Sequence, residues 1–273
     1  MPPKIVIMAG PNGAGKSTLA PALLRGFFEV EHFVNADVIA QGLSQYAPES
    51  VAFEAGRLML RRLGELAAAQ ANFAFESTLS SRTFSPWLKK RKAEGYTVAI
   101  FFVCLPSPDA HILRVAQRVK AGGHHVDDET VRRRYGRSIA NFCELYRPLA
   151  DFWTVIHNYE DRPAEGLATG YGPETRFVHQ PSLWAEFERY LGMSAFPTGL
   201  DERFRDIDGM YRAMRIGVNR ALMRHKRLGE SVAGWDEVTQ SPKIIPPEEI
   251  PELDTEWPAD LYYGPRDNPK YKK

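Results

Sequence analysis

The sequence predicts an α/β fold with a doubly wound, mostly parallel sheet of five strands, helices on both faces, and a C-terminal helical and extended appendage. Three observations lead to this prediction. Short apolar runs alternate with longer amphipathic segments through the first half of the chain, which is typical of repeated strand–helix units. A glycine-rich loop separates the first apolar run from the first amphipathic segment, and helical spacing returns near the C-terminus.

The strands are expected at apolar runs short enough to cross a sheet once. These runs are Ile5–Ala9, His32–Asn35, Phe73–Glu76, Val98–Val103 and Phe152–Ile156. The helices are expected at the amphipathic segments Ser17–Phe28, Pro48–Gln70, Arg82–Gly95, Ser107–Ala121 and Asp127–Leu149. The Gly122-Gly123 pair between the last two helices is a candidate hinge, because glycine restricts the backbone least.

The alternation loosens beyond residue 159, and we expect a boundary near residue 200. Residues 1–199 then form the α/β domain, which ends with a candidate hairpin at Leu167–Val178 and a short helix near Pro181–Leu191. Residues 200–273 form the appendage.

The appendage begins with clean helical spacing over Asp206–Leu228, and one face of this helix is basic. A short hairpin is expected after it. Six prolines from Pro246 onward predict an extended tail.

The composition is that of an ordinary globular protein. The 273 residues include 35 Lys+Arg and 34 Asp+Glu, a formal net charge of +1, and 44% are hydrophobic. These values exclude disorder of the whole chain. They argue against nucleic-acid binding through bulk charge, which requires the neutralisation of many phosphates. Cys104 and Cys143 are too few for a disulfide framework or a zinc site. No apolar run approaches the ~20 residues of a membrane span and no signal-peptide core precedes the first strand, so we expect a cytoplasmic protein without a membrane partner.

The segment Gly10–Ser17 satisfies the phosphate-loop pattern G-x-x-x-x-G-K-[ST] and lies between a predicted strand and a predicted helix, as the motif requires. It predicts the P-loop NTPase fold with ATP and Mg²⁺ as cofactors. In such a loop the backbone N–H groups surround phosphates, Lys16 reaches the β- and γ-phosphate oxygens, and the Ser17 hydroxyl ligates Mg²⁺. The predicted nucleotide-binding residues are Gly10, Pro11, Asn12, Gly13, Ala14, Gly15, Lys16, Ser17 and Thr18. The alternative is a glycine-rich turn with a surface lysine.

Two carboxylates follow the next two predicted strands, at the edge where a doubly wound sheet binds its ligands. Asp37 is a candidate general base that accepts the proton of an acceptor hydroxyl as the γ-phosphoryl group leaves ATP. Its alternative role is the N-cap of the next helix. Glu76, followed by Ser77 and Thr78, is a candidate for binding the acceptor or a magnesium-bound water. Here the alternative is a capped strand-to-helix turn.

Arginines gather on both sides of the Gly122-Gly123 break, and phosphoryl transfer requires positive charge near the moving group. At most two or three of them can reach the phosphates, and the others are expected to be solvated or paired with acidic neighbours. The candidates are Arg114, Arg118, Arg132, Arg133, Arg134 and Arg137. His124 and Arg137 are also candidates for contact with the substrate, with simple exposure as the alternative.

Several of these segments together resemble the zeta-toxin family of P-loop kinases. They are Gly10–Thr18, Asn35–Asp37, Phe75–Thr78, Arg118–His124 and Arg132–Ser138. The match covers about residues 4–160 and is closest to a short bacterial branch that is also labelled a predicted ABC-type ATPase. The Leu-Ser-Gly-Gly-Gln signature of true ABC ATPases, and the strand ending in Asp-Glu that follows it, are missing from the sequence.

The resemblance implies that Lys16 and Ser17 hold ATP and Mg²⁺, that Asp37 is the base, and that Glu76 belongs to the acceptor site. It also implies Arg118 and Arg134 as the arginines that act on the phosphates. A nucleotide sugar such as UDP-N-acetylglucosamine is the implied acceptor, and a protein antitoxin is an implied partner. The sequence departs from the short branch at His157-Asn158-Tyr159, where Asp-Asn-Ser is usual, and at Asp127, where proline is usual. Both departures concern the acceptor pocket.

The leading hypothesis is therefore an ATP- and Mg²⁺-dependent kinase that acts on a hydroxyl of a small metabolite, with toxicity as a hypothesis on top of it. One alternative is a kinase for RNA or a dinucleotide cofactor. Another is a nucleotide-dependent switch without an acceptor, in which Asp37 is only a cap. Three partners stay open for the basic helix Asp206–Leu228, namely an antitoxin, a nucleic acid and the body of its own domain.

Overall fold

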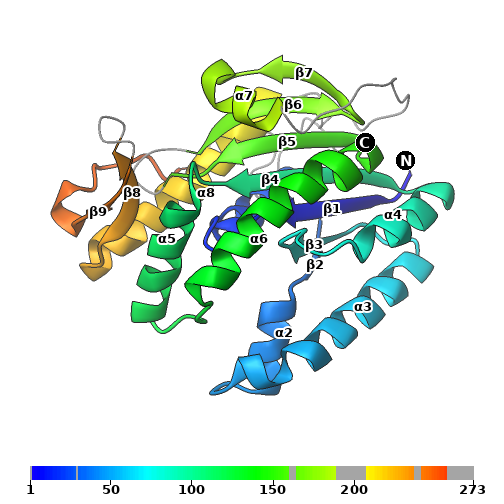
Figure 1. Cartoon of the computed structure of the whole chain (residues 1–273), viewed down its shortest axis with the longest axis horizontal. Coiled ribbons are helices and arrows are strands. Elements are labelled where there is room, and N and C mark those ends of the chain that lie inside the picture. The colour runs from blue at the N-terminus through cyan, green and yellow to red at the C-terminus, as the bar shows by residue number, and fades with distance from the viewer. Residues whose placement is uncertain (1, 29, 160–163, 189–206, 237–240, 257–273) are drawn as a thin grey trace.

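A seven-stranded sheet forms the centre of the part of the chain that the computed structural model describes, which is residues 2–28, 30–159, 164–188, 207–236 and 241–256 (Figure 1). The strand order is β2-β3-β1-β4-β5-β6-β7. Five neighbouring strands run parallel, namely β1 (Lys4–Ala9), β2 (His32–Val34), β3 (Phe73–Ser77), β4 (Thr97–Cys104) and β5 (Phe152–His157). The predicted parallel core is confirmed, with β1 between β3 and β4.

Two further strands extend this sheet beyond the five that the sequence predicts. The expected hairpin is present as β6 (Glu165–Tyr171) and β7 (Glu174–Val178), and β6 pairs antiparallel with β5. A hairpin pattern gives the pairing of its own two strands but not the neighbour that its free edge meets. The sequence therefore indicated the hairpin without its place in the sheet.

Helices lie on both faces of the sheet, close to the predicted segments. They are α1 (Lys16–Pro21) with the π-helical turn η1 (Ala22–Phe27), α2 (Ala36–Leu43), α3 (Ala52–Ala68) after the 3-10 turn η2 (Pro48–Val51), α4 (Phe84–Ala93), α5 (Pro108–Lys120), α6 (Asp128–Asn141) with the π-helical turn η3 (Phe142–Tyr146) and the 3-10 turn η4 (Arg147–Leu149), and α7 (Pro181–Glu188). Pro21 lies where α1 passes into η1, and a proline inside a helix removes one backbone hydrogen bond.

Alternate residues of β1, β3, β4 and β5 pack against opposite layers, as the two-residue period of a strand requires. In β1, Val6 and Met8 join the core that includes buried residues of α1 and η1. Ile5 and Ile7 join the opposite core with Met59 and other residues of α3, α4 and η3. Burial on both faces explains why these strands are apolar throughout.

The basic C-terminal helix packs against its own domain. Of the three partners left open for it, the body of its own domain is therefore confirmed. Helix α8 (Ile207–Leu228) contributes Met214, Val218 and Leu222 to the same core as β1 and α1. Gly217 faces η1, where a Cβ on it would lie 3.1 Å from that of Ala22. Tyr211 lies within hydrogen-bond distance of two threonine hydroxyls of the sheet, at 3.1 and 3.3 Å.

A two-stranded sheet follows α8, formed by β8 (Val232–Asp236) and β9 (Ser241–Ile245), with the 3-10 turn η6 (Pro247–Glu249) after it. Val232 and Ile245 are buried in the core that holds α8. The predicted boundary near residue 200 and most of the predicted extended tail lie outside the described residues. Among the helices that the structure describes, none combines the length and the apolar character needed to span a bilayer.

Candidate functional site

The phosphate loop lies between β1 and α1, at the carboxyl edge of the central strand. Gly10, Gly13 and Gly15 all have positive φ angles, of 131°, 79° and 83°. A Cβ on Gly10 would lie 1.9 Å from the carbonyl oxygen of Val103 on β4. Side chains are therefore excluded where the backbone bends most. Helix α1 begins after Gly15, and no side chain caps its N-terminus, so its first N–H groups are oriented as in an anion site.

Three buried side chains from outside the loop donate hydrogen bonds to its carbonyl oxygens. His111 of α5 binds the carbonyl of Asn12 at 2.7 Å, and Asn158, directly after β5, binds that of Ala14 at 2.9 Å. The Arg114 guanidinium lies 3.4 Å from the carbonyls of two adjacent loop residues. With the carbonyls held outward, the N–H groups of a tight turn face the opposite side, where a phosphate binds.

His111 acts as a neutral bridge between two loops. Its Nε2 accepts a hydrogen bond from the Leu105 N–H at 3.1 Å, and its Nδ1 must then carry the proton that it donates to the Asn12 carbonyl. The pKa of His111 is lowered to about 3, chiefly by complete burial, with a smaller contribution from the positive charges of Arg114 and Lys16. The imidazole is therefore uncharged at neutral pH.

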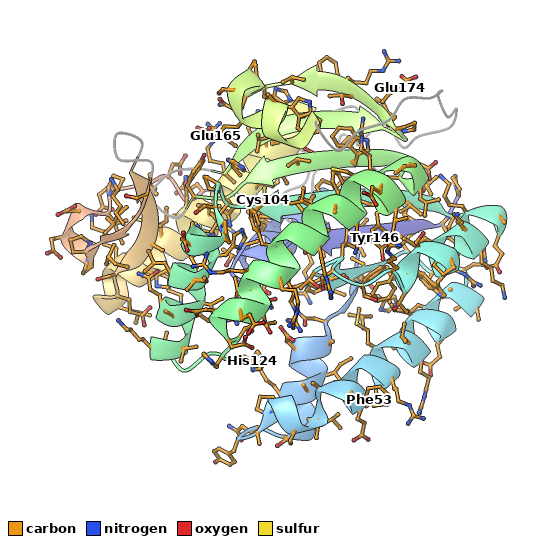
Figure 2. The ribbon with its side chains drawn as sticks, viewed as in Figure 1. Phe53, Cys104, His124, Tyr146, Glu165 and Glu174 are labelled. Atoms are coloured by element: carbon orange, nitrogen blue, oxygen red, sulfur yellow. The ribbon has the colours of Figure 1, made fainter. Side chains whose placement is uncertain are left out.

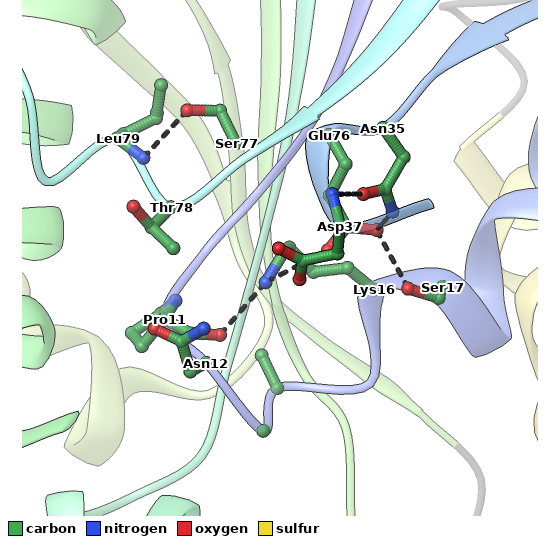
Figure 3. A network of polar contacts seen from close by, with 12 residues as sticks. Pro11, Asn12, Lys16, Ser17, Asn35, Asp37, Glu76, Ser77, Thr78 and Leu79 are labelled. Atoms are coloured by element: carbon green, nitrogen blue, oxygen red, sulfur yellow. Dashed lines mark hydrogen bonds and ion pairs between the residues drawn. The ribbon is translucent and has the colours of Figure 1, made fainter. Parts of the chain in front are cut away.

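Lys16, Ser17 and Glu76 form one polar network at the mouth of the loop (Figure 3). The Lys16 amine donates to the Pro11 carbonyl at 3.0 Å and lies 3.4 Å from one carboxylate oxygen of Glu76. The other oxygen of Glu76 accepts from the Ser17 hydroxyl at 2.8 Å and from the Asn35 amide at 2.9 Å. The sequence-predicted residues Lys16, Ser17 and Glu76 are thus brought together.

Asn35, and not Asp37, caps helix α2. The Asn35 side chain accepts hydrogen bonds from the backbone N–H groups of Asp37, at 2.8 Å, and Val38, at 3.4 Å. The alternative role of Asp37 as this N-cap is therefore wrong. Asp37 is exposed in the first turn, and in Figure 3 its carboxyl group points into the same space as Glu76 and Lys16.

Ser77 ends β3, and Thr78 begins the turn that α6 and η3 hold in place. Ser77 accepts from the Leu79 N–H at 3.1 Å, and Thr78 shares a hydrogen bond of 2.7 Å with the Ser80 hydroxyl. Leu79 adopts a positive φ of 53°, which is unusual for a side chain of this size. The turn is fixed by donors from the facing helix, namely Ser138 to the Thr78 carbonyl, Asn141 to that of Leu79 and Tyr146 to that of Ser81.

The arginines differ in what they contact. Arg134 donates to the Asn12 side chain at 3.0 Å, so α6 brings it to the phosphate loop. Arg118 instead donates to the carbonyl of His124 at 2.6 and 3.1 Å, within the loop that joins α5 to α6. Figure 2 shows His124 in this loop, at the end of the two helices away from the sheet. Arg137 is exposed on α6.

Two contributors to the site were not predicted, namely His111 and Asn158. Arg114 was among the candidate arginines, but its contact with the carbonyl oxygens of the loop was not predicted. The signal for Asn158 is its place directly after the last parallel strand, because the carboxyl ends of neighbouring parallel strands meet at one edge. No comparable signal marks His111, which the helical pattern of α5 places among ordinary buried residues. Asp127, where the sequence departs from the short branch, caps α6 by accepting from the Thr130 N–H at 2.8 Å.

Comparison with known proteins gives one family and several similar proteins. The family model of the zeta toxin matches residues 1–158. An uncharacterized protein of Haemophilus influenzae is 29% identical over 134 residues, which are 48% of this chain and 92% of the relative. The segment that matches the family model contains all five parallel strands and the whole phosphate loop.

Two solved structures are similar in fold. The complex of AvrRxo1-ORF1 and AvrRxo1-ORF2 with ATP has a TM-score of 0.54 at 17% identity, and the match covers 80% of this chain and 76% of that one. The PezAT chromosomal toxin–antitoxin system of Streptococcus pneumoniae has a TM-score of 0.51 at 16% identity, with 81% and 88% covered. At these identities the likeness concerns the fold.

Proposed function

The chain belongs to the zeta toxin family, and from this premise we propose that it is a kinase that transfers the γ-phosphoryl group of ATP to a hydroxyl of a small metabolite. The single observation that carries the proposal is the network at the loop. There the Glu76 carboxylate lies within ion-pair distance of the buried Lys16 amine and accepts a hydrogen bond from the Ser17 hydroxyl, while the second carboxylate, Asp37, is exposed in the first turn of α2. Phosphoryl transfer requires these groups at this place.

The phosphates of ATP bind to the N–H groups of the loop and to Lys16. The Lys16 amine contacts the Pro11 carbonyl and Glu76. The side chain is 5% exposed and lies above the loop, so a phosphate oxygen can replace the Pro11 carbonyl as its partner without a large movement. Its positive charge then stabilises the charge on the transferred group.

The residues around Ser17 fit a magnesium ion. The Ser17 hydroxyl and the Glu76 carboxylate offer oxygen atoms 2.8 Å apart, and oxygen is the ligand that Mg²⁺ prefers. Ser17 would hold the ion directly and Glu76 would hold it or one of its waters. When bound, Mg²⁺ neutralises charge on the phosphates.

Asp37 is the proposed general base. Its backbone is fixed by the Asn35 cap, while its carboxylate stays exposed on the acceptor side of the loop. The acceptor hydroxyl oxygen forms a bond to the γ-phosphorus, the bond from that phosphorus to the β,γ-bridging oxygen breaks, and Asp37 takes the hydroxyl proton. Arg134 is the proposed residue that neutralises the transferred group, and its hydrogen bond to Asn12 of the loop supports this role.

Arg118 is the second proposed arginine, and it acts only if it releases the His124 carbonyl. Its present contact closes the loop around Gly122 and Gly123, where a Cβ on Gly123 would lie 2.5 Å from the Arg118 side chain. Movement of this loop would bring Arg118 toward the phosphates. His124, Arg137, Ser77 and Thr78 belong to the proposed acceptor side.

A nucleotide sugar such as UDP-N-acetylglucosamine is the proposed acceptor, and a protein antitoxin the proposed partner. Family membership supports both. The two solved neighbours bear on the partner alone, since one is a toxin–antitoxin system and the other is a two-protein complex with ATP.

The test is incubation of the protein with γ-labelled ATP, Mg²⁺ and a panel of nucleotide sugars, an RNA and a dinucleotide, followed by separation of the products. We expect label on a nucleotide sugar, and none with Lys16→Ala. Label on RNA or on the dinucleotide would contradict a nucleotide sugar as the acceptor and support the labelled compound instead. Label found only as free phosphate in every reaction would contradict the kinase and favour a nucleotide-dependent switch.

A further inference from the structure

Asn35 contacts both of the elements that carry the two carboxylates of the proposed site (Figure 3). It directly follows β2, whose register pairs Val34 with Phe75 of β3. Because neighbouring parallel strands advance together, the next residue of each, Asn35 and Glu76, are neighbours at the carboxyl edge of the sheet. Asp37 stands two residues after Asn35, in the first turn of α2. The buried Asn35 side chain therefore joins the end of β3 to the start of α2.

The Asn35 amide uses its two polar atoms on two different partners. Its Oδ1 accepts hydrogen bonds from the backbone N–H groups of Asp37, at 2.8 Å, and Val38, at 3.4 Å. Its Nδ2 donates to the Glu76 carboxylate at 2.9 Å. The reverse orientation would set the amide NH2 against two N–H donors and the amide oxygen against a carboxylate, so only the observed orientation satisfies these partners. One side chain thus ties Glu76 to the first turn of α2.

Capping alone does not explain why an asparagine stands at this position. Serine and aspartate cap helices about as well. An aspartate here would place a second negative charge beside Glu76, which electrostatic repulsion disfavours. A serine has one oxygen on a shorter side chain, so it cannot serve the helix and the carboxylate with separate atoms. Asparagine is therefore the good N-cap that also supplies a separate donor to Glu76.

The bond from Asn35 to Glu76 differs from the other contacts of that carboxylate. Glu76 also accepts from the Ser17 hydroxyl and pairs with the Lys16 amine. Under the proposed function Ser17 and Lys16 engage Mg²⁺ and the phosphates, so their contacts with Glu76 change in each catalytic cycle. The Asn35 amide takes part in neither interaction, and its backbone is extended at the junction of β2 and α2. It can therefore hold one oxygen of Glu76 throughout, by a charge-assisted hydrogen bond.

We propose that Asn35 is a positioning residue that fixes the Glu76 carboxylate relative to Asp37, with its NH2 group on Glu76 and its carbonyl on the first turn of α2. The inference rests on the proposed function, because phosphoryl transfer gives Glu76 its place at Mg²⁺ and Asp37 its role as base. Asn35 acts through these two residues and takes no part in the making or breaking of bonds. Residues behind the ligands of a metal commonly act in this way.

The activity test separates capping from the contact with Glu76. Asn35→Ser keeps a cap and loses the donor, whereas Asn35→Ala loses both. We expect kcat for transfer from labelled ATP to UDP-N-acetylglucosamine to fall at least about tenfold in both variants, the scale for partners of metal ligands. The KM for ATP should change less than about twofold, because the loop and Lys16 bind the phosphates.

The matched control is Asn72→Ser, at the opposite end of β3. The Asn72 side chain also accepts a backbone N–H, that of Lys4 at 2.9 Å, but it lies just before the first residue of β3 and Glu76 lies near the last. This control removes an asparagine amide from the same strand without touching the carboxyl edge of the sheet. Asn72→Ser should therefore leave kcat and the KM for ATP unchanged.

Two readouts without nucleotide test the same bond. Urea unfolding of Asn35→Ser, Glu76→Ala and the double variant should be non-additive, with the equilibrium constant of unfolding about tenfold below the product of the separate effects, because both changes remove one hydrogen bond to a charged group. Hydrogen exchange should show the Asp37 and Val38 amides protected in Asn35→Ser as in the unmodified protein. In Asn35→Ala their protection should fall about fivefold, the cost of a lost cap.

Transfer by Asn35→Ser at the rate of the unmodified protein would overturn the inference, since the cap alone would then account for Asn35. Additive effects in urea would overturn it as well. So would a fall in kcat that accompanies lost protection of the Asp37 amide in Asn35→Ser, because a disordered α2 would explain both. Absence of transfer by the unmodified protein to every compound of the panel would instead contradict the proposed function, and with it any positioning role.

Discussion

His111 should lower the free energy of unfolding in mild acid, and the substitution His111→Gln should remove this loss. The imidazole is completely buried, with both nitrogens engaged by the backbone of two loops. Protonation would place a second N–H against the Leu105 N–H, with no acceptor in place for it. Burial therefore lowers the pKa of His111 from 6.5 to about 3, and the folded protein resists a proton that the unfolded chain accepts.

The sign and size of the effect follow from the two pKa values. Between pH 6.5 and pH 3 the unfolded chain binds one more proton at His111 than the folded protein, so the free energy of unfolding falls as the pH falls. Each pH unit in this window costs up to about 1.4 kcal/mol. From pH 7 to pH 5 the loss from this histidine alone is about 2 kcal/mol.

Urea unfolding of the wild type and of His111→Gln at pH 7 and pH 5 measures this loss. A glutamine amide has a donor and an acceptor that can replace both hydrogen bonds, but it does not titrate. Between pH 7 and pH 5 the free energy of unfolding of the wild type should fall by about 2 kcal/mol more than that of His111→Gln. His32→Gln is the control, because it shows how far replacing a histidine at an exposed position of β2 changes the free energy of unfolding between the two pH values. A difference between wild type and His111→Gln that is equal at the two pH values would refute the reasoning.

Three other substitutions test the site. Gly10→Ala should lower the free energy of unfolding by at least about 3 kcal/mol in urea and abolish ATP binding, because its Cβ meets the Val103 carbonyl at a positive φ; normal binding would contradict this. Glu76→Gln should cost about 2 kcal/mol of nucleotide-free stability and lower kcat at least about tenfold, since charge-assisted hydrogen bonds are lost; unchanged values would exclude the network. Arg134→Ala should lower kcat about 100-fold with ATP affinity nearly constant, whereas the exposed neighbour Arg133→Ala should not; equal effects would remove Arg134 from the mechanism.

The parallel sheet and the phosphate loop could be predicted from the sequence because both depend on local signals. The strands of the core are short apolar runs, and the loop is a spaced pattern of glycine, lysine and serine. The place of Glu76 beside Ser17 also followed, since both stand at the carboxyl edge of neighbouring strands.

Contacts between residues far apart in the chain could not be predicted in this way. His111 binds a carbonyl 99 positions away, and Arg134 binds a side chain 122 positions away. The choice of Asn35 over Asp37 as cap depends on which residue leaves the strand with extended backbone angles, and the two positions have equally suitable side chains. The pairing of β6 with β5 and the contact of β8 with α5 depend on packing between elements.

The rate of γ-phosphoryl transfer by Asp37→Asn tests the central claim most directly. It is measured with labelled ATP and UDP-N-acetylglucosamine, beside the wild type and Asp128→Asn, which removes a carboxylate at the matching first turn of α6. We predict a fall of at least about 100-fold for Asp37→Asn with an unchanged Kd for ATP, and no comparable fall for Asp128→Asn. Transfer by Asp37→Asn at the wild-type rate would contradict the account of Asp37 as the base of a kinase.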